Sequence, residues 1–254
     1  MKLGAQLFSL RKFIKTPEDI RTTFQKIKEI GFENVQFSGG GPIDAHELKA
    51  ISDETGLPIV CTHSAYDRIL NDTEALIEEH KIFGCPVIGL GSMPKEFRNN
   101  ERTPNDFFNE LKTPVEKILD SGLRFAYHNH AFEFDIKTPE GEMIYDYMLR
   151  TLPNWQFIMD TYWVEYAGHS AVDYIAKIGA DRLTNIHYKD MANTEKREIC
   201  ACGMGTLDFA TITEACLKNG GVENVLIEQD NAVDFDDPFG QMEIGFKSLR
   251  PLIK

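Results

Sequence analysis

Short apolar runs recur about every 30 residues along the chain, and each is followed by a segment with the signals of a helix. The runs predict eight strands, at residues 2–10, 34–37, 58–63, 87–91, 124–130, 156–160, 183–190 and 224–228. They are continuous runs of Val, Ile, Leu and Phe rather than alternating ones, which is typical of strands covered on both faces.

Helix signals fill the intervals between these runs. Thr16 and Pro17 are the cap and first-turn residues of a helix start, and Gly31 is the residue type that ends one. By the same criteria we expect helices at residues 16–30, 44–56, 72–83, 103–121, 143–151, 170–178, 207–220 and from 238 to the C-terminus. Eight strand-then-helix units predict a single-domain (β/α)8 TIM barrel over residues 1–254. A doubly wound open sheet competes, but the segment after the first strand lacks its GxGxxG fingerprint.

Charge and composition exclude several classes of partner. The net charge is −13, from 27 basic and 40 acidic residues, which argues against a nucleic-acid partner. The N-terminal segment lacks a signal-peptide core, and no stretch approaches the roughly 18 apolar residues of a membrane span. We therefore expect a cytoplasmic protein that binds neither nucleic acid nor membrane, with a homo-oligomer left open. The five cysteines contain no CxxC pair, so we expect reduced thiols.

Polar residues gather at the C-terminal ends of the predicted strands, where the active site of a TIM barrel is assembled. His46 and His80 fall within predicted helices and are set aside, and the position of His169 decides nothing. The remaining candidates for a site are His63, His128, His130, Glu133, Asp160, His187, Lys189, Asp190 and Glu228.

Carboxylates combined with imidazoles suit one divalent ion, Mn²⁺, Mg²⁺, Co²⁺ or Zn²⁺. A strand-end carboxylate can also be a helix cap or half of an ion pair. Three such groups, Asp160, His187 and Glu228, each follow an apolar run, and leaving them unpaired in a barrel mouth would be costly. The metal site is favoured for that reason. Lys189 is expected either to pair with Asp190 or to contact the substrate.

The Gly203-Met204-Gly205 segment lies ahead of the seventh helix. Its backbone N–H groups are expected either to bind an anionic or hydroxyl-rich ligand or to form a plain turn.

The motifs resemble those of the xylose-isomerase-like sugar isomerase/epimerase family of TIM barrels. The resemblance spans almost the whole chain and is carried by Gly4-Ala-Gln-Leu-Phe-Ser9, Cys61-Thr-His63, Tyr127-His-Asn-His-Ala-Phe-Glu-Phe134, Met159-Asp-Thr161, Ile186-His-Tyr-Lys-Asp190, Gly203-Met-Gly-Thr-Leu-Asp208 and Ile227-Glu-Gln-Asp230. It implies a metal bound by Glu133, Asp160, His187 and Glu228, with Glu133 and Glu228 as the catalytic pair.

Two departures from the family pattern bear on the site. Many members carry the first glutamate within the fifth strand, where this chain has His128, so His128 or His130 could replace Glu133 as the first ligand. Many also have a histidine three residues after the strand-six aspartate, where this chain has Trp163, and an indole there would stack on a sugar face.

This set of residues fits proton transfer at a carbon next to a carbonyl. We expect a metal-dependent isomerase or epimerase acting on a small sugar or keto-sugar, with Glu228 as the base and Glu133 or His130 returning the proton. His63, His128, His130, Trp163 and Lys189 are the expected substrate contacts. Three alternatives stay open: a lyase, dehydratase or C-glycoside-cleaving enzyme using the same site, a non-catalytic sugar-binding barrel, and, less compatible with the acidic charge, an enzyme that cleaves DNA at abasic sites.

Overall fold

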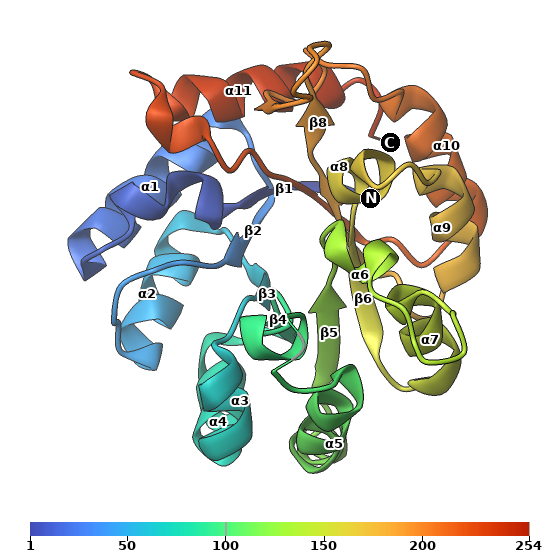
Figure 1. Ribbon diagram of the computed structural model, residues 1–254. Helices are drawn as coiled ribbons and strands as arrows, with labels where there is room; N and C mark the ends of the chain where they lie inside the picture. Colours follow the sequence, from blue (N-terminus) through green and yellow to red (C-terminus); the bar gives the residue numbers. More distant parts are fainter. Residues whose placement is uncertain (100, 254) are drawn as a thin grey trace.

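The apolar runs become the parallel strands of one sheet, which curls into a barrel ringed by helices (Figure 1). The computed structural model describes residues 1–99 and 101–253 of the chain. Within them the sheet has eight strands in the order β3-β2-β1-β10-β7-β6-β5-β4. Their bounds are β1 Lys2–Gln6, β2 Asn34–Phe37, β3 Ile59–Thr62, β4 Val87–Leu90, β5 Arg124–His128, β6 Gln156–Asp160, β7 Asn185–Tyr188 and β10 Asn224–Ile227.

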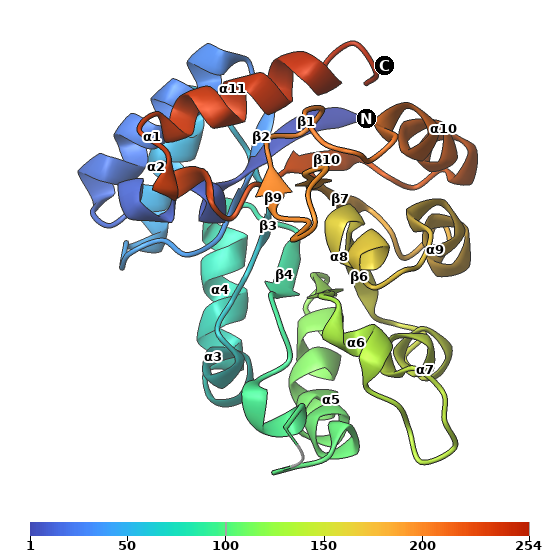
Figure 2. The same cartoon turned by 45° about the horizontal axis from the view of Figure 1, so that its top comes forward.

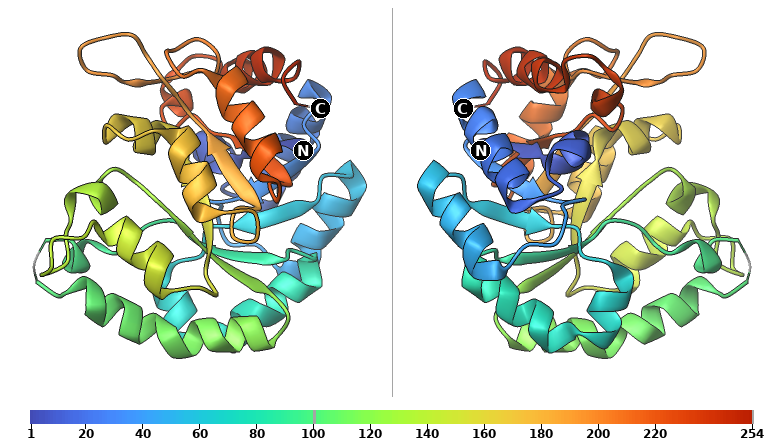
Figure 3. Two further views of the ribbon diagram at one scale, coloured as in Figure 1. Left: turned by 90° about the vertical axis from the view of Figure 1, so that its right-hand side faces the viewer. Right: turned by 90° about the vertical axis from the view of Figure 1, so that its left-hand side faces the viewer.

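Helices cover the outside of the sheet on all sides (Figures 2 and 3). The α-helices are α1 Pro17–Ile30, α2 Ala45–Thr55, α3 Tyr66–Asn71, α4 Thr73–Phe83, α5 Pro104–Asp120, α6 Phe132–Asp135, α7 Ile144–Thr151, α8 Thr161–Tyr166, α9 Ala171–Ile178, α10 Phe209–Asn219 and α11 Pro238–Leu249. Three 3₁₀-helices join them within the described residues: η1 Leu7–Phe13, η2 Lys95–Phe97 and η3 Ala232–Asp234. The predicted cap at Thr16 is present as a capping box with Asp19. The single-domain TIM barrel is therefore confirmed.

Several predicted boundaries are wrong, the first of them because a side chain captures the backbone. The first strand ends at Gln6 instead of residue 10, since the Gln6 side chain accepts a hydrogen bond from Phe8 N and starts η1. The predicted helix 72–83 is preceded by α3, with Asp72 between the two helices. The region after Asp190, predicted to be irregular, contains the hairpin of β8 (Asp190–Met191) and β9 (Ile199–Cys200). The last helix ends at Leu249 rather than at the C-terminus.

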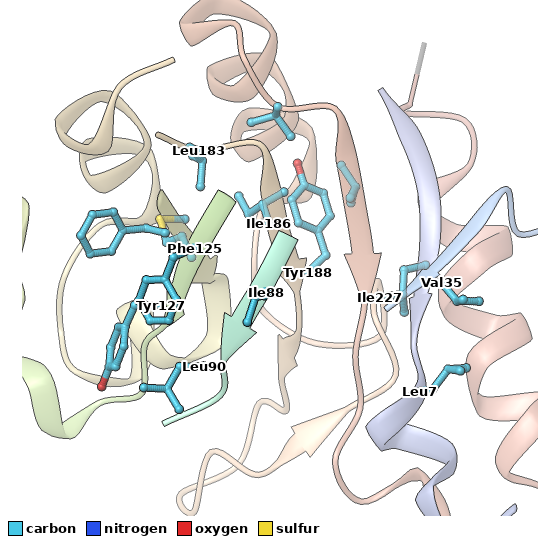
Figure 4. Packing of buried hydrophobic residues seen from close by; sticks show 14 of the residues in the cluster. Leu7, Val35, Ile88, Leu90, Phe125, Tyr127, Leu183, Ile186, Tyr188 and Ile227 are labelled. Atoms are coloured by element: carbon cyan, nitrogen blue, oxygen red, sulfur yellow. The ribbon is translucent and has the colours of Figure 1, made fainter. Parts of the chain in front are cut away.

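Two apolar layers lie on the two sides of the strands. Phe125 and Tyr127 lie on the same side of β5, in the large core between strands and helices (Figure 4). The residues between them point into the barrel because side chains alternate along a strand. There, Cys61, Val87, Ala126 and Ile158 form a separate buried cluster. Two residues after Ile158 the strand reaches Asp160, so this dry cluster is the floor beneath the polar strand ends.

The barrel has a seam between β3 and β4. In the described chain these strands share only an isolated bridge, Ser64 with Leu90, supported by a hydrogen bond from Ser64 N to Gly89 O of 2.8 Å. Gly89 is required there, because a Cβ at that position would lie 2.2 Å from the carbonyl oxygen of Thr62. The other neighbouring strands of this sheet are joined by parallel ladders, with one register shift between Val35 and Gln36 where β2 pairs with β3.

None of the helices in the described part of the chain combines the length and the apolar character needed to cross a membrane.

Candidate functional site

Four strand ends place a histidine, an aspartate, a second histidine and a glutamate around one point. Asp160 and His187 are register partners on β6 and β7, so their side chains leave the sheet on the same face. Glu228 follows β10 and lies two residues beyond Leu226, the register partner of His187, so it shares that face. His128 ends β5. All four are buried, and one ligand atom from each lies within 4.8 Å of the others.

The contacts within this cluster bring imidazole nitrogens against carboxylate oxygens. His128 Nε2 lies 3.3 Å from Asp160 Oδ2, and His187 Nδ1 lies 2.8 Å from Glu228 Oε2. The second contact lacks the angles of a hydrogen bond, and within the described residues His187 Nδ1 has no hydrogen-bond partner. Buried polar atoms without partners are rare and call for a bound group.

The outer nitrogen of each imidazole fixes its tautomer. His128 Nδ1 lies 3.0 Å from the carbonyl oxygen of Gly91, and His187 Nε2 lies 2.7 Å from Gln36 Oε1. Both oxygens can only accept, so these nitrogens donate. In neutral His187 the inner nitrogen therefore directs its lone pair at Glu228, whereas His128 Nε2 can donate to Asp160 until a bound ion displaces that proton. Metal-binding histidines are typically held this way, by a hydrogen bond from the second nitrogen. The four residues therefore fit a divalent ion.

Lys189 places a positive charge against the same oxygens. Its Nζ lies 2.8 Å from Asp160 Oδ2, 2.9 Å from Glu228 Oε2 and 3.2 Å from Asp230 Oδ2. Burial alone would lower the pKa of Lys189, but the three carboxylates outweigh it and raise that pKa well above its ordinary value. Three carboxylates against one ammonium leave two negative charges, of which a protonated His128 would offset one. The site therefore still favours an added cation.

Burial and neighbouring charges set the protonation of the other groups. Burial lowers the pKa of His187 and, further, that of His63, so both imidazoles are neutral. Burial also opposes ionisation of Asp160 and Glu228, yet Lys189 outweighs it and holds both carboxyl pKa values below their ordinary range. For His128, burial is outweighed by Asp160, and its pKa is raised.

Glu133 lies outside the cluster. Its carboxylate is fully buried and accepts hydrogen bonds from Tyr127 Oη at 2.6 Å and His130 N at 2.8 Å. Burial raises its pKa to about 7. The family resemblance assigned Glu133 as the first metal ligand. In the structure His128 lies at that place in the cluster, and His128 is one of the two alternatives that the sequence left open. The His130 ring packs edge-on against that of His128, with centroids 4.9 Å apart, but His130 is not among the four residues whose ligand atoms converge.

Trp163 and His130 form an aromatic wall beside the charges. Their ring centroids are 5.3 Å apart, and Lys189 Nζ lies 5.6 Å from the Trp163 ring. Trp163 is held in place because its backbone N–H donates to Asp160 Oδ1, which caps α8. Asp160 therefore uses one oxygen to start a helix and the other to face the site.

Asp190 does not pair with Lys189, so that expectation is wrong. Alternation turns the two side chains to opposite sides of the strand end. Asp190 Oδ2 instead accepts from the N–H groups of Gly203 and Gly205, at 2.8 and 2.9 Å, and Oδ1 accepts from those of Met191 and Leu207. The N–H groups of Gly203 and Gly205 therefore bind an internal carboxylate and are not directed at a ligand.

A cavity of about 460 Å³ opens over the cluster. It is lined by Phe8, Ser38, Gly39, His63, Ser64, Ala65, Tyr66, Leu90, Gly91, Ser92, His128, His130, Lys189, Glu228 and Asp230. A groove of about 510 Å³ between α5 and α7 contains none of the predicted site residues. The cavity at the strand ends is therefore the candidate substrate site.

Three polar residues of the site were missed by sequence reasoning: Gln6, Gln36 and Asp230. Gln36 interrupts the apolar run of β2 and binds His187, and Asp230 lies two residues beyond Glu228 and binds Lys189. Gln6 ends β1 and lies 3.5 Å from His63. Two sequence signals could have identified such residues. One is a polar residue inside an apolar strand, and the other is a polar residue two positions from a predicted site residue.

Comparison with known proteins agrees with the fold and the family resemblance. A family model described as xylose isomerase-like TIM barrel matches residues 24–251. A 3-dehydro-D-guloside 4-epimerase of Escherichia coli (strain K12) is 34% identical over 89 residues, which are 35% of this chain and 31% of that protein. The match therefore spans about a third of the length of that relative.

Solved structures show the same fold at low identity. A sugar phosphate isomerase/epimerase from Parabacteroides distasonis covers 100% of both chains with a TM-score of 0.78 and 22% identity. A 3-keto-D-glucoside 4-epimerase from E. coli covers 99% of both chains, with a TM-score of 0.71 and 21% identity. The IolI protein with a bound zinc atom covers 100% of this chain and 98% of its own, with a TM-score of 0.73 and 11% identity.

Proposed function

Since the chain belongs to the xylose isomerase-like TIM barrel family, we propose that it is a divalent-metal-dependent epimerase or isomerase of keto-sugars. The observation that carries this proposal is the buried cluster of His128, Asp160, His187 and Glu228, in which one ligand atom of each residue lies within 4.8 Å of the others and His187 Nδ1 has no hydrogen-bond partner in the described structure. The partial similarity to a 3-dehydro-D-guloside 4-epimerase supports a keto-glycoside as the substrate to test first.

His128, Asp160, His187 and Glu228 would hold the ion. When bound, a divalent ion supplies Lewis acidity toward a carbonyl and the adjacent hydroxyl, which makes the neighbouring C–H more acidic. Such activation suits this site, because the low pKa of Glu228 keeps that carboxylate ionised but makes it a weak base.

The residues that line the cavity can divide the proton transfer between them. Glu228 takes the proton from the carbon beside the carbonyl. Burial lowers the pKa of His130 to about 2, so its imidazole is neutral and would return a proton from the other side as a relay, accepting one from solvent as it donates its own. Return to the opposite face of the same carbon inverts its configuration, whereas return to the neighbouring carbon exchanges aldose and ketose. Lys189, whose ammonium is paired with Asp160, Glu228 and Asp230, stabilises negative charge beside Glu228. Glu133 is removed from direct contact by its bonds to Tyr127 and His130, and we expect it to position His130.

Proton NMR in D₂O tests the reaction directly. The protein would be stripped of metal, reloaded with Mn²⁺, Co²⁺, Mg²⁺ or Zn²⁺ in separate samples, and incubated with methyl 3-keto-glucoside. We expect exchange of the α-proton and appearance of the C4 epimer only in loaded samples.

Other outcomes would identify the competing functions. Loss of water or of the aglycone together with exchange would indicate a lyase. Full activity after exhaustive metal removal would refute metal dependence. Binding of the keto-sugar without exchange in any loaded sample would indicate a non-catalytic sugar-binding barrel.

A further inference from the structure

A second hollow continues from the site on the side of the barrel mouth away from the metal cluster. It has a volume of about 490 Å³ and lies between the β2–α2 loop and helices α3 and α4. On the basis of the function proposed above, we propose that this hollow binds the second, non-reacting ring of a neutral glycoside, while the keto-sugar ring lies over Glu228.

The two hollows adjoin at the segments that follow β2 and β3. Five residues line both of them: Ser38, Gly39, His63, Ser64 and Ala65. Ligand pockets commonly measure about 300–1,000 Å³, and each hollow alone falls within that range. Together they offer room for a ligand of two rings, with the shared residues at the junction.

The side chains of the second hollow suit a sugar ring. Phe37, Ile43, Leu48, Leu76 and Phe83 supply an apolar wall, and a pyranose has an apolar C–H face that packs on such surfaces. Thr62, Ser38 and Ser64 supply hydroxyl groups near the junction. A wall of this kind with a few polar groups is the usual composition of a small-molecule site.

The glycine run at the rim is fixed by close packing. A Cβ on Gly40 would lie 2.3 Å from the Phe37 ring, and one on Gly41 would lie 1.9 Å from Lys15 O. The loop therefore lies against its neighbours and adds no side chain of its own to narrow the opening.

The charges around the hollows favour a neutral ring over a phosphate. Arg68 and Lys189 are the described Lys or Arg residues that line either hollow. Arg68 is bound by Asp72 at 2.9 Å and by Glu79 at 2.8 Å, and Lys189 is bound by three carboxylates. A phosphate would meet paired cations and the acids that pair them, which is unfavourable.

His63 offers a directed hydrogen bond at the junction. Gln6 Oε1 accepts from Phe8 N at 3.0 Å, so Gln6 Nε2 is the amide donor that faces His63 Nδ1 at 3.5 Å. The proton of the neutral imidazole is then on Nε2, an atom that is buried without a partner in the described structure. The His63 ring lies 5.0 Å from that of His128 and 5.7 Å from that of His187, so an oxygen of a substrate bound over the cluster would satisfy it.

Substrate pairs and one blocking variant test this proposal. Metal-loaded protein would be assayed for epimerisation of methyl 3-keto-glucoside, a 3-keto disaccharide of two glucose units, and 3-keto-glucose 6-phosphate. We expect kcat/KM for the disaccharide to be at least tenfold that for the methyl glycoside, and the phosphate to be the poorest substrate. Ala45 lines only the second hollow. Ala45→Trp should abolish the disaccharide preference while changing methyl glycoside turnover less than twofold.

Ala75→Trp is the matched control, because Ala75 is exposed on α4 and lines neither hollow. This variant should leave kcat/KM unchanged for the methyl glycoside, the disaccharide and the phosphate. Equal kcat/KM for the two glycosides, or a disaccharide preference that survives in Ala45→Trp, would overturn the subsite even if epimerisation itself is confirmed. A better rate with the phosphate would overturn the neutral ligand.

A binding experiment separates failure of the subsite from failure of the proposed function. If no substrate is turned over, saturation-transfer NMR with the unoxidised disaccharide still reports on the hollow. The wild type should bind it at least fivefold more tightly than Ala45→Trp. Equal affinities of the wild type and Ala45→Trp for the disaccharide would overturn the proposed subsite, whether or not the protein catalyses epimerisation.

Discussion

The mouth of the barrel has two unlike halves. Strands β5, β6, β7 and β10 contribute His128, Asp160, His187, Lys189 and Glu228, whereas the ends of β2, β3 and β4 contribute mainly small neutral residues such as Ser38, Ser64 and Ser92. The charged half is crowded, with ammonium and carboxylate oxygens within 3.2 Å of one another. The neutral half is open and continues into a second hollow. The charged groups proposed for the reaction therefore lie on one side of the site, and the space for the substrate lies on the other.

Glu228→Gln should give the largest effect. We expect turnover of a keto-glycoside to fall about 1,000-fold, because the variant loses the proposed base and a metal ligand, and general base catalysis alone contributes about 10²–10⁴-fold. Glu133→Gln, which changes a carboxylate that does not line the cavity, should cost less than about tenfold on the same scale. The C4 proton signal in D₂O measures both. Similar losses in the two variants would contradict the division between lining and supporting carboxylates.

Lys189→Met should destabilise the metal-free protein by about 3 kcal/mol, because breaking a buried ion pair leaves uncompensated charge. Urea denaturation in EDTA measures the free energy of unfolding. Lys177→Met serves as the control, since Lys177 pairs with Asp146 on the surface and its loss should cost under about 1 kcal/mol. Equal effects would show that the charged half has no special dependence on its internal cation.

Removal of divalent ions should lower the free energy of unfolding by about 2.7 kcal/mol relative to protein at an ion concentration of about 100 times Kd. Thermal unfolding followed with EDTA and then with excess Mn²⁺ or Co²⁺ measures this difference. In Asp160→Asn the shift should be largely lost, while Ala75→Trp should retain it. A shift of the same size in Asp160→Asn would place the ion elsewhere.

The smallest effect concerns His80, which lines the second hollow and is buried. Burial lowers its pKa to about 4, below the ordinary value of 6.5. A group whose folded pKa is depressed adds stability above pH 6.5 that is lost as pH falls toward 4. Between pH 7.5 and 5 this loss is about 2 kcal/mol.

Urea denaturation across that pH range measures the loss, and His80→Gln should remove it while other titrating groups contribute equally to both proteins. His46→Gln is the control, because His46 is exposed on α2. An unchanged pH slope in His80→Gln would mean that His80 is not held neutral by burial.

The charged half was predictable because its residues follow the strand period. Asp160, His187 and Glu228 each end or follow an apolar run, and parallel strands bring such ends to one rim. The same period of two explains why the Lys189 side chain lies on the same face as that of His187, whereas the Asp190 side chain lies on the opposite face.

The features that could not be predicted depend on individual side-chain hydrogen bonds that change the local path of the chain. Glu133 was placed at the metal by resemblance, yet the turn into α6 brings its carboxylate to Tyr127 and to the backbone of His130. Likewise, the Gln6 side chain ends β1 early. These outcomes rest on individual hydrogen bonds, which no hydrophobic pattern specifies. The second hollow also has no sequence signature, since it arises from the spacing of α2 and α4 against the sheet.

The seam between β3 and β4 means that the barrel is a rolled ribbon with two edges. The two chain ends lie side by side in Figures 1 and 3. Joining them and cutting the chain near Asp72, between α3 and α4, would give a protein whose strands run in sequence from one edge to the other, β4 through β10 and then β1 through β3. Because the cut removes no ladder, such a circular permutant should fold.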